Sequence, residues 1–235
     1  MDLFRRKYKN IYFDLDRTLW DYESNARITL NDIYDGLGFD KEISEFDLFY
    51  RTFQKHNEQL WAAYARGDIK KPVLCTKRFE LTLAEFGLKN DALTEKISED
   101  YIRQIPNHKN LLPYAYEILT YLKEKKYRLF ILTNGFNETQ FSKIRNSHIE
   151  GFFEKIITSD IAKSQKPNSG IFEYALNSVN AKKSESLMVG DDFNADIVGS
   201  HNFGIDQVFY NQKDQQFKPI FTYEISSLRE LKGIL

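Results

Sequence analysis

The sequence contains a single cysteine, Cys75, and therefore cannot form an internal disulfide. No run of apolar residues approaches the roughly 18 that a membrane-spanning helix needs. No apolar segment follows the basic pair Arg5-Arg6, as an export signal would require. These absences predict a cytoplasmic protein without a membrane anchor, in which Cys75 is a packed residue rather than a nucleophile.

An excess of charge of one sign is also lacking. The chain has 33 Lys and Arg against 34 Asp and Glu, a formal net charge of −1, which provides no overall attraction to nucleic acid or anionic membranes. The four histidines have no ligand spacing to one another, and we interpret them as surface or packing residues: His56, His108, His148 and His201. At 235 residues the chain can form one domain and a modest second one.

Short apolar runs alternate with helical periodicity in much of the chain. The runs predict buried strands at 11–13, 128–132, 155–158, 187–189 and 207–210, with a last short strand and helix beyond. Helical patterns lie between them, at 113–126, at 138–147, from Lys166-Pro167 and from Asp196. Strand–helix alternation with short connections predicts an α/β fold with a doubly wound, parallel, Rossmann-like sheet.

Residues from about Tyr22 to Ile105 show helical periodicity and no strand pattern. Breaks near Gly38, Gly67 and Gly87 divide this stretch into four helices, and Pro106 ends the last of them. We expect a small helical bundle inserted between two pieces of the α/β domain. The predicted boundaries are 1–20 and 108–235 for the core, and 21–107 for the helical domain.

Two aspartates directly follow the first predicted strand. Asp14 and Asp16 point the same way because residues two apart on a strand share a face, and ligands of open α/β sheets bind beyond such strand ends. Two carboxylates a few Å apart repel by roughly 4 kcal/mol at an effective dielectric constant near 20. This pair favours a Mg²⁺ site around a nucleophilic aspartate, although a loop with an Asp-capped turn fits the pair alone equally well.

Polar groups also stand at other predicted strand ends or at a helix start, where a parallel sheet brings them to one edge. These groups are Thr18, Thr133-Asn134-Gly135, Lys166, Asp191-Asp192 and Asp196. The set suits phosphoryl transfer. One carboxylate can attack phosphorus, a second acid can protonate the leaving oxygen, hydroxyl and amide donors can hold the phosphate oxygens, and a lysine can offset the anions.

Each piece also has a plain reading of its own. Asn134-Gly135 is a turn dipeptide, Lys166-Pro167 is typical of a solvated helix start, and Asp196 suits a helix N-terminus. Taken together, these separate explanations are unconvincing. They would make it a coincidence that all the segments stand at strand ends or at a helix start and follow one another in this order.

At this point four segments resemble the motifs of a known family. FDLDRTL at 13–19, LTNG at 132–135, Lys166-Pro167 and GDDFNAD at 190–196 are similar to motifs I to IV of the haloacid dehalogenase (HAD) superfamily. The helical insert stands where that family places its C1 cap. The resemblance implies a HAD-like core with a cap, and a hydrolase that forms an aspartyl-phosphate. The dehalogenases themselves lack the second aspartate of motif I, so its presence in this chain argues for a phosphatase.

The resemblance also implies roles, which we carry over residue by residue. Asp14 is expected to be the nucleophile and Asp16 the general acid/base. Mg²⁺ is expected to be held by the Asp14 carboxylate, the Asp16 backbone carbonyl and Asp191. Thr133 is expected to grip the phosphate and Lys166 to stabilise the nucleophile and the transferred group. The backbone amides near Asn134 and Gly135 are expected to bind the phosphate as well. Asp196 is expected to act through water or by orienting its neighbours. The role of Asp192 stays open.

Arg17 departs from the family pattern, because the family usually has glycine there. Its side chain could enter the cleft between cap and core and contact substrate, or point to solvent. A finer similarity points to the YjjG/YfnB-type pyrimidine 5′-nucleotidases; the matching residues are Trp61, Tyr64, Gly67, Ile69, Arg78-Phe79, Gln140 and Tyr210-Asn211. This similarity implies a nucleoside monophosphate as substrate. The sequence leaves open whether the chain is a monomer or a homodimer. Trp61, Tyr64 and Phe79 fit the core of a helical bundle as well as base stacking.

Three alternatives remain at this stage. A sugar phosphomutase of the same superfamily would pass the phosphoryl group to a sugar instead of water. A DxD glycosyltransferase would leave Lys166 and Asp191-Asp192 unexplained. A non-enzymatic, receiver-like phosphate-binding module combines similar residues, but a helical insert of roughly 80 residues argues against it because connections in such folds are short.

Overall fold

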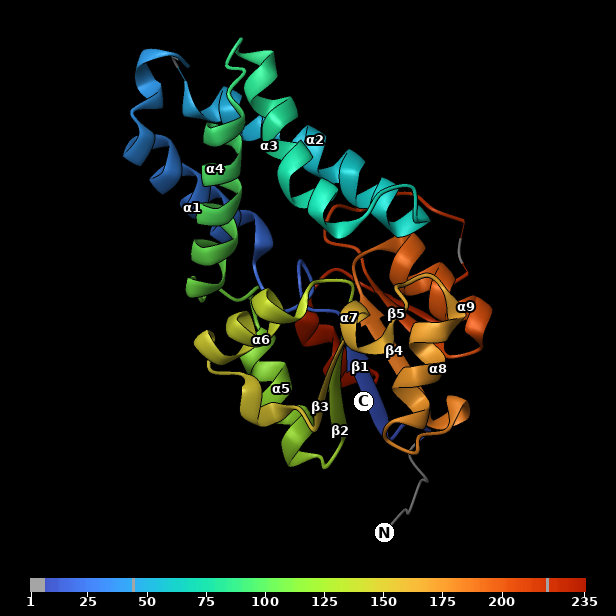
Figure 1. Cartoon of the computed structure of the whole chain (residues 1–235). Helices are drawn as coiled ribbons and strands as arrows, with labels where there is room; N and C mark the ends of the chain where they lie inside the picture. The colour runs from blue at the N-terminus through green and yellow to red at the C-terminus, as the bar shows by residue number, and fades with distance from the viewer. Residues whose placement is uncertain (1–6, 44, 219) are drawn as a thin grey trace. The chain divides into compact units, whose positions relative to one another are not determined.

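The structure is a computed structural model that describes residues 7–43, 45–218 and 220–235. Arg5 and Arg6 lie outside the described residues. The chain divides into two units, one formed by residues 1–22 and 109–235 and the other by residues 23–108 (Figure 1). In the described ranges, no helix is both long enough and apolar enough to cross a bilayer.

The first unit is built on a six-stranded sheet in which all neighbouring strands are parallel. The strand order is β3-β2-β1-β4-β5-β6. The bounds are Asn10–Phe13 for β1, Arg128–Thr133 for β2, Lys155–Thr158 for β3, Ser186–Gly190 for β4, Asp206–Tyr210 for β5 and Tyr223–Ile225 for β6. Figure 1 shows β1, which comes first in the chain, between β2 and β4. The predicted doubly wound parallel sheet is confirmed.

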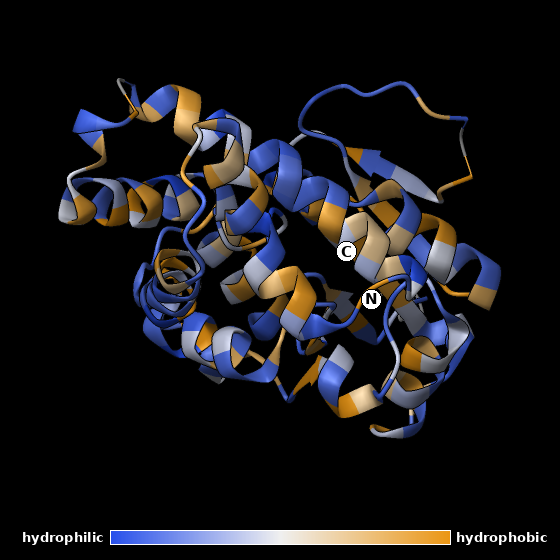
Figure 2. Ribbon diagram, turned by 45° about the horizontal axis from the view of Figure 1, so that its top comes forward, coloured by the Kyte–Doolittle hydropathy of each residue, from blue (hydrophilic) through white to orange (hydrophobic). Residues whose placement is uncertain are grey.

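Alternate residues of the central strands face opposite sides of the sheet, and both sides are covered. On one side Tyr12 of β1 and Phe130 of β2 pack with Phe172 in a buried apolar cluster. The neighbouring residues Ile11 and Phe13 are also fully buried, as parallel strands covered on both faces require. The helices show mixed hydrophobic and hydrophilic residues along their length, as expected of amphipathic helices that cover a sheet (Figure 2).

The helices of this unit follow the strands in turn. They are α5 Ala115–Glu124, α6 Asn137–Asn146, α7 Ser159–Ala162, α8 Ser169–Asn177 and α9 Gly199–Phe203, with a π-helix at Phe193–Val198 and 3₁₀-helices at Glu150–Phe152, Lys183–Glu185 and Leu228–Gly233. One helix begins later than expected, because α8 starts at Ser169 and not at Lys166-Pro167. The side chain of Asn134 bonds to both the N–H and the C=O of Lys166, which holds that residue out of the helix.

The described residues of the second unit form four α-helices, as the periodicity predicts, and 3₁₀-helices at Phe39–Lys41 and Ile105–Asn107. The α-helices are α1 Tyr22–Leu37, α2 Phe46–Arg66, α3 Lys71–Glu85 and α4 Asp91–Gln104. Phe79 is fully buried and stacks on Phe53 with ring centroids 5.1 Å apart, so it belongs to the core of this unit. Trp61 and Tyr64 are half-buried and form an edge-to-face pair at 5.8 Å. Cys75 is buried, in agreement with the prediction of a packed residue.

Candidate active site

A buried lysine lies at the centre of the site. The Lys166 Nζ atom donates hydrogen bonds to Asp14 Oδ1 at 2.6 Å, to Asp196 Oδ1 at 2.6 Å and to the Leu132 carbonyl at 2.7 Å. The Lys166 side chain is 2% exposed, so its charge is compensated by these acceptors and hardly by water. Asp14 and Lys166 are more than 150 residues apart in the sequence. They meet because Asp14 directly follows β1 and Lys166 lies in the segment after β3, and the ends of parallel strands share one edge of the sheet.

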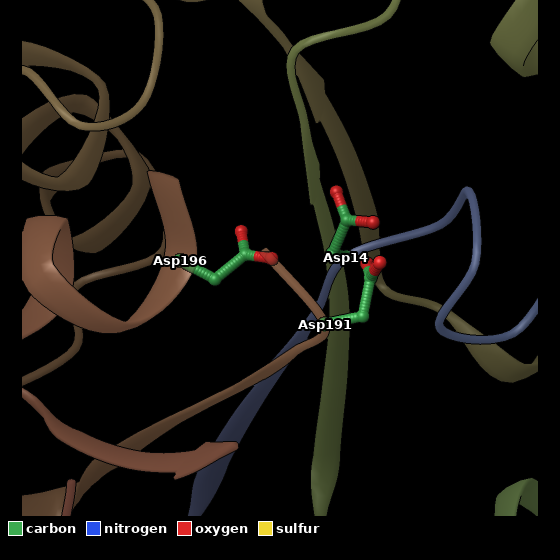
Figure 3. Close-up of side chains that lie close together, drawn as sticks. All are labelled: Asp14, Asp191 and Asp196. Atoms are coloured by element: carbon green, nitrogen blue, oxygen red, sulfur yellow. The ribbon is translucent and has the colours of Figure 1, made fainter. Parts of the chain in front are cut away.

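A third carboxylate completes an acidic cluster. Oxygen atoms of Asp14, Asp191 and Asp196 lie within 4.8 Å of one another, and Figure 3 shows their carboxyl groups converging from the end of β1 and from the segment after β4. Thr18 Oγ1 donates to Asp191 Oδ1 at 3.2 Å, which orients that carboxylate. Three carboxylates and one ammonium leave an excess of negative charge, which a divalent cation would neutralise.

The pKa values of the three carboxyl groups are raised, first by burial and then by the neighbouring negative charges. Burial and the negative charge of Asp14 together raise the pKa of Asp191 to about 7, against the opposing positive charge of Arg17. Burial also raises the pKa of Asp14 and of Asp196, although Lys166 lowers both. Burial alone would lower the pKa of Lys166, but the two carboxylates bonded to it reverse the effect, and its pKa lies above the ordinary value. The lysine is therefore firmly charged, while the carboxylates lack enough positive charge around them.

The segment after β4 is shaped to bring Asp196 into the cluster. Asp192 caps the π-helix, since its Oδ1 accepts hydrogen bonds from the backbone N–H groups of Asn194 and Ala195. The Asp196 carboxylate lies directly against Gly190, where a Cβ atom would meet Asp196 Oδ2 at 2.2 Å. Both Asp196 oxygens have donors, Lys166 Nζ on Oδ1 and the Asp192 N–H on Oδ2. Asp196 therefore orients the lysine, and Asp14 and Asp191 are the carboxylates of the cluster that could hold a metal ion.

Two residues after β2 organise the other side of the site. The Asn134 side chain donates to the Lys166 carbonyl at 2.8 Å and accepts from the Lys166 N–H at 2.7 Å, so it positions the lysine backbone. The Gly135 N–H donates to Thr133 Oγ1 at 3.1 Å. Thr133 is 2% exposed. Asn134 can therefore offer a phosphate only its backbone amide, because its side chain is engaged elsewhere.

Asp16 lies in a second group of contacts. Its Oδ1 accepts from Lys143 Nζ at 2.6 Å and its Oδ2 from Gln140 Nε2 at 2.9 Å, and both donors come from α6. The same Gln140 Nε2 reaches Thr133 Oγ1 at 2.8 Å. Sequence reasoning missed Lys143 altogether and noted Gln140 only through resemblance. The available signal was their spacing of three residues on the helix that follows motif II, which places both on one helical face.

Arg17 has a left-handed backbone, with φ of 66°, a conformation that glycine adopts at little cost. This conformation explains why glycine is usual at this position of the family pattern. The Arg17 N–H donates to the Trp20 carbonyl at 2.9 Å, and the guanidinium lies 4.5 Å from the centroid of the Tyr22 ring. Arg17 also lowers the pKa of Asp191, so its charge acts on the site.

Comparison with known proteins identifies relatives along nearly the whole chain. The family model of haloacid dehalogenase-like hydrolases matches residues 8–204. The HAD-hydrolase YfnB of Bacillus subtilis is 28% identical over 233 residues, 98% of this chain and 96% of YfnB. Its crystal structure, described as bound to magnesium, covers 97% of this chain and 98% of its own with a TM-score of 0.87.

Two enzymes with named substrates are similarly related. The pyrimidine 5′-nucleotidase YjjG of Escherichia coli is 28% identical over 232 residues, 97% of this chain and 98% of YjjG. A glyceraldehyde 3-phosphate phosphatase of Pyrococcus furiosus is 27% identical over 236 residues, 98% of this chain and 94% of the enzyme. The resemblance to the YjjG/YfnB-type subgroup that the sequence motifs indicate is confirmed.

Proposed function

Because the chain belongs to the haloacid dehalogenase-like hydrolase family, we propose that it is a Mg²⁺-dependent phosphomonoester hydrolase that works through an aspartyl-phosphate. The observation that carries this proposal is the buried cluster in which Lys166 Nζ lies 2.6 Å from Asp14 Oδ1 and Asp191 lies beside Asp14. A nucleophilic carboxylate needs its negative charge kept available and correctly aimed, and a buried ammonium bonded to one of its oxygens does both.

The residues present fit a magnesium ion. The donor atoms are carboxylate oxygens, which Mg²⁺ prefers. Burial, and then the negative charge of neighbouring carboxylates, raise the pKa values of Asp14 and Asp191, so a cation bound there would favour their ionised forms. We propose that the Asp14 carboxylate, the Asp16 backbone carbonyl and Asp191 hold the ion. When bound, Mg²⁺ supplies positive charge that lets the phosphate approach the carboxylates.

Different residues of the site would then carry out the steps of the reaction. Asp14 attacks phosphorus and forms an acyl-phosphate, while Asp16 gives a proton to the leaving oxygen. Asp16 next takes a proton from the water that cleaves the acyl-phosphate and frees Asp14. The Thr133 hydroxyl and the backbone amides near Asn134 and Gly135 donate to the phosphate oxygens, and Lys166 holds Asp14 in place throughout.

We further propose a nucleoside 5′-monophosphate as the substrate. Support comes from YjjG, a pyrimidine 5′-nucleotidase similar to this chain over nearly its full length. The helical unit, residues 23–108, would serve as the cap that selects the leaving group. The positive charge of Arg17 opposes the rise in the pKa of Asp191, so the residue acts on the acidic cluster. Arg17 would contact the substrate.

The proposal is tested by phosphate release from nucleoside monophosphates and sugar phosphates, including glyceraldehyde 3-phosphate, with Mg²⁺ and with a chelator. We expect Mg²⁺-dependent release that is fastest with pyrimidine 5′-monophosphates. Asp14→Asn is expected to abolish turnover without loss of fold, whereas Asp32→Asn, an exposed aspartate of α1, should retain it. Full activity in Asp14→Asn would refute the mechanism. An isomerised sugar phosphate without free phosphate would identify a mutase, and no turnover of any ester would favour a binding module.

A further inference from the structure

The Asp16 carboxylate is held from one helix. Lys143 Nζ donates to its Oδ1 at 2.6 Å and Gln140 Nε2 donates to its Oδ2 at 2.9 Å. Each oxygen of the proposed general acid/base thus has a donor of its own. Lys143 and Gln140 lie three residues apart on α6 and share a helical face, so one rigid element sets both contacts.

Lys143 is placed in an unusual environment for a lysine. Its side chain is 5% exposed, and the ammonium lies 4.3 Å from the centroid of the Trp20 ring, which is itself fully buried. Lysine is almost never buried without a charged partner, and Lys143 forms an ion pair with Asp16 at 2.6 Å. An ammonium between an aromatic face and a carboxylate is restricted to one position. It therefore determines where the Asp16 carboxylate lies.

Gln140 connects Asp16 to the proposed phosphate-binding residues. Its Nε2 donates to Thr133 Oγ1 at 2.8 Å as well as to Asp16, and its side chain is fully buried. If the Gln140 amide were turned over, its Oε1 atom would face the Asp16 carboxylate, and two oxygen acceptors would be opposed. The contacts therefore support the orientation in which Nε2 faces Asp16. Gly135 makes room for this side chain, because a Cβ there would meet Gln140 Nε2 at 2.3 Å.

We propose that Lys143 and Gln140 are positioning residues for the general acid/base Asp16, a role that rests on the proposed function. They aim the Asp16 carboxyl at the leaving oxygen, and Gln140 keeps it in register with Thr133. In the first step the Asp16 proton passes to the leaving alkoxide as the ester P–O bond breaks and the Asp14–phosphorus bond forms. In the second step a water oxygen bonds to phosphorus, its proton returns to Asp16, and the bond to Asp14 breaks. Lys143 and Gln140 neither gain nor lose protons.

This role makes the effect of Lys143 depend on the leaving group. An alkoxide such as the 5′-oxygen of a nucleoside needs a proton to leave, whereas 4-nitrophenolate leaves without one. Lys143→Met should therefore lower kcat for uridine 5′-monophosphate by about 10- to 100-fold, a part of the 10²–10⁴ that general acid catalysis typically contributes. KM should stay within about threefold, and the burst of 4-nitrophenolate from 4-nitrophenyl phosphate should change by less than about threefold.

A double-mutant cycle with Asp16→Asn separates this role from substrate binding. If Lys143 acts through Asp16, adding Lys143→Met to Asp16→Asn should change the rate by less than about twofold. Additive losses, an equal loss on both esters, or a raised KM with unchanged kcat would each overturn the proposal. Arg145→Met, which removes a positive charge from an exposed position of the same helix, is the matched control and should behave like the parent protein.

Two further measurements keep the test decisive. Thermal unfolding checks the fold of each variant. If Lys143→Met does not fold, Lys143→Gln, which keeps a neutral donor, takes its place. Lys143→Gln should show the same preference for the aryl ester to a smaller degree. Asp14→Asn, measured in the same assays, separates failure of the positioning role from failure of the proposed function. If Asp14→Asn is inactive and Lys143→Met shows no leaving-group effect, the positioning role fails and the proposed function stands.

Discussion

Removal of the buried Lys166 ammonium should destabilise the α/β unit strongly. Lys166→Met keeps the length of the side chain but leaves Asp14 Oδ1, Asp196 Oδ1 and the Leu132 carbonyl without the donor that now lies within 2.7 Å of each. Breaking a buried ion pair by removing one partner costs roughly 3–5 kcal/mol. Repulsion among the remaining carboxylates, about 4 kcal/mol for a pair 4 Å apart at an effective dielectric constant of 20, has the same sign.

We therefore expect Lys166→Met to lower the free energy of unfolding by about 3–5 kcal/mol at pH 8 in the presence of a chelator. The deficit should shrink as the pH falls toward 6, because Asp14 and Asp196, whose pKa values burial already raises, can then take up protons. Mg²⁺ should stabilise the variant more than the parent protein, because the ion supplies positive charge to the same carboxylates.

The assay is guanidinium or urea unfolding with and without Mg²⁺, followed by circular dichroism. Lys213→Met, at an exposed position, is the control and should change stability by less than about 0.5 kcal/mol. A deficit for Lys166→Met below about 1 kcal/mol in chelator would refute the reasoning, since it would mean that the ammonium is not what makes the buried carboxylates tolerable.

Two smaller perturbations test other parts of the structure. Gly190→Ala should destabilise the protein by about 1–3 kcal/mol, because its Cβ would displace the Asp196 carboxylate; urea unfolding measures this, and unchanged stability would contradict the close approach. Asp206→Asn should cost roughly 0.5–1 kcal/mol at pH 7. Burial raises the pKa of Asp206, but hydrogen bonds from Lys7 and Tyr8 outweigh it and lower the pKa below the ordinary value. The cost should be complete above the unfolded-state pKa of about 3.9 and vanish as the pH falls through the lower folded value; a deficit that persists at pH 2.5 would contradict this.

Much of the fold follows from patterns that are local in the sequence. The run Ile11–Phe13 predicts a buried strand, and β1 spans Asn10–Phe13. The helix expected at 113–126 is present as Ala115–Glu124. Apolar periodicity is enough for these elements because their burial is decided by one face or one run of side chains. The helix expected from Lys166-Pro167 begins three residues later, because contacts with Asn134, distant in the sequence, hold Lys166 in another conformation.

The candidate site divides in the same way. Asp14, Asp191 and Lys166 could be predicted because each stands at a strand end or helix start that parallel topology brings to one edge. Lys143 could not be assigned, because its spacing from Gln140 indicates a shared helical face but not whether that side chain is solvated or buried against Trp20 and Asp16. The structure adds a role for the Asn134 side chain that the sequence did not indicate, because this side chain positions the Lys166 backbone.

The sequence by itself determined the elements, the parallel sheet and which acidic and basic residues reach its carboxyl edge, because these depend on side-chain periodicity and on the order of strands and helices. Only the tertiary structure decided which charge meets which. Lys166 holds Asp14 and Asp196, Lys143 and Gln140 hold Asp16, and Asp192 caps a helix. Pairings of this kind depend on distances of a few Å between segments far apart in the chain, and a linear pattern carries no information at that scale.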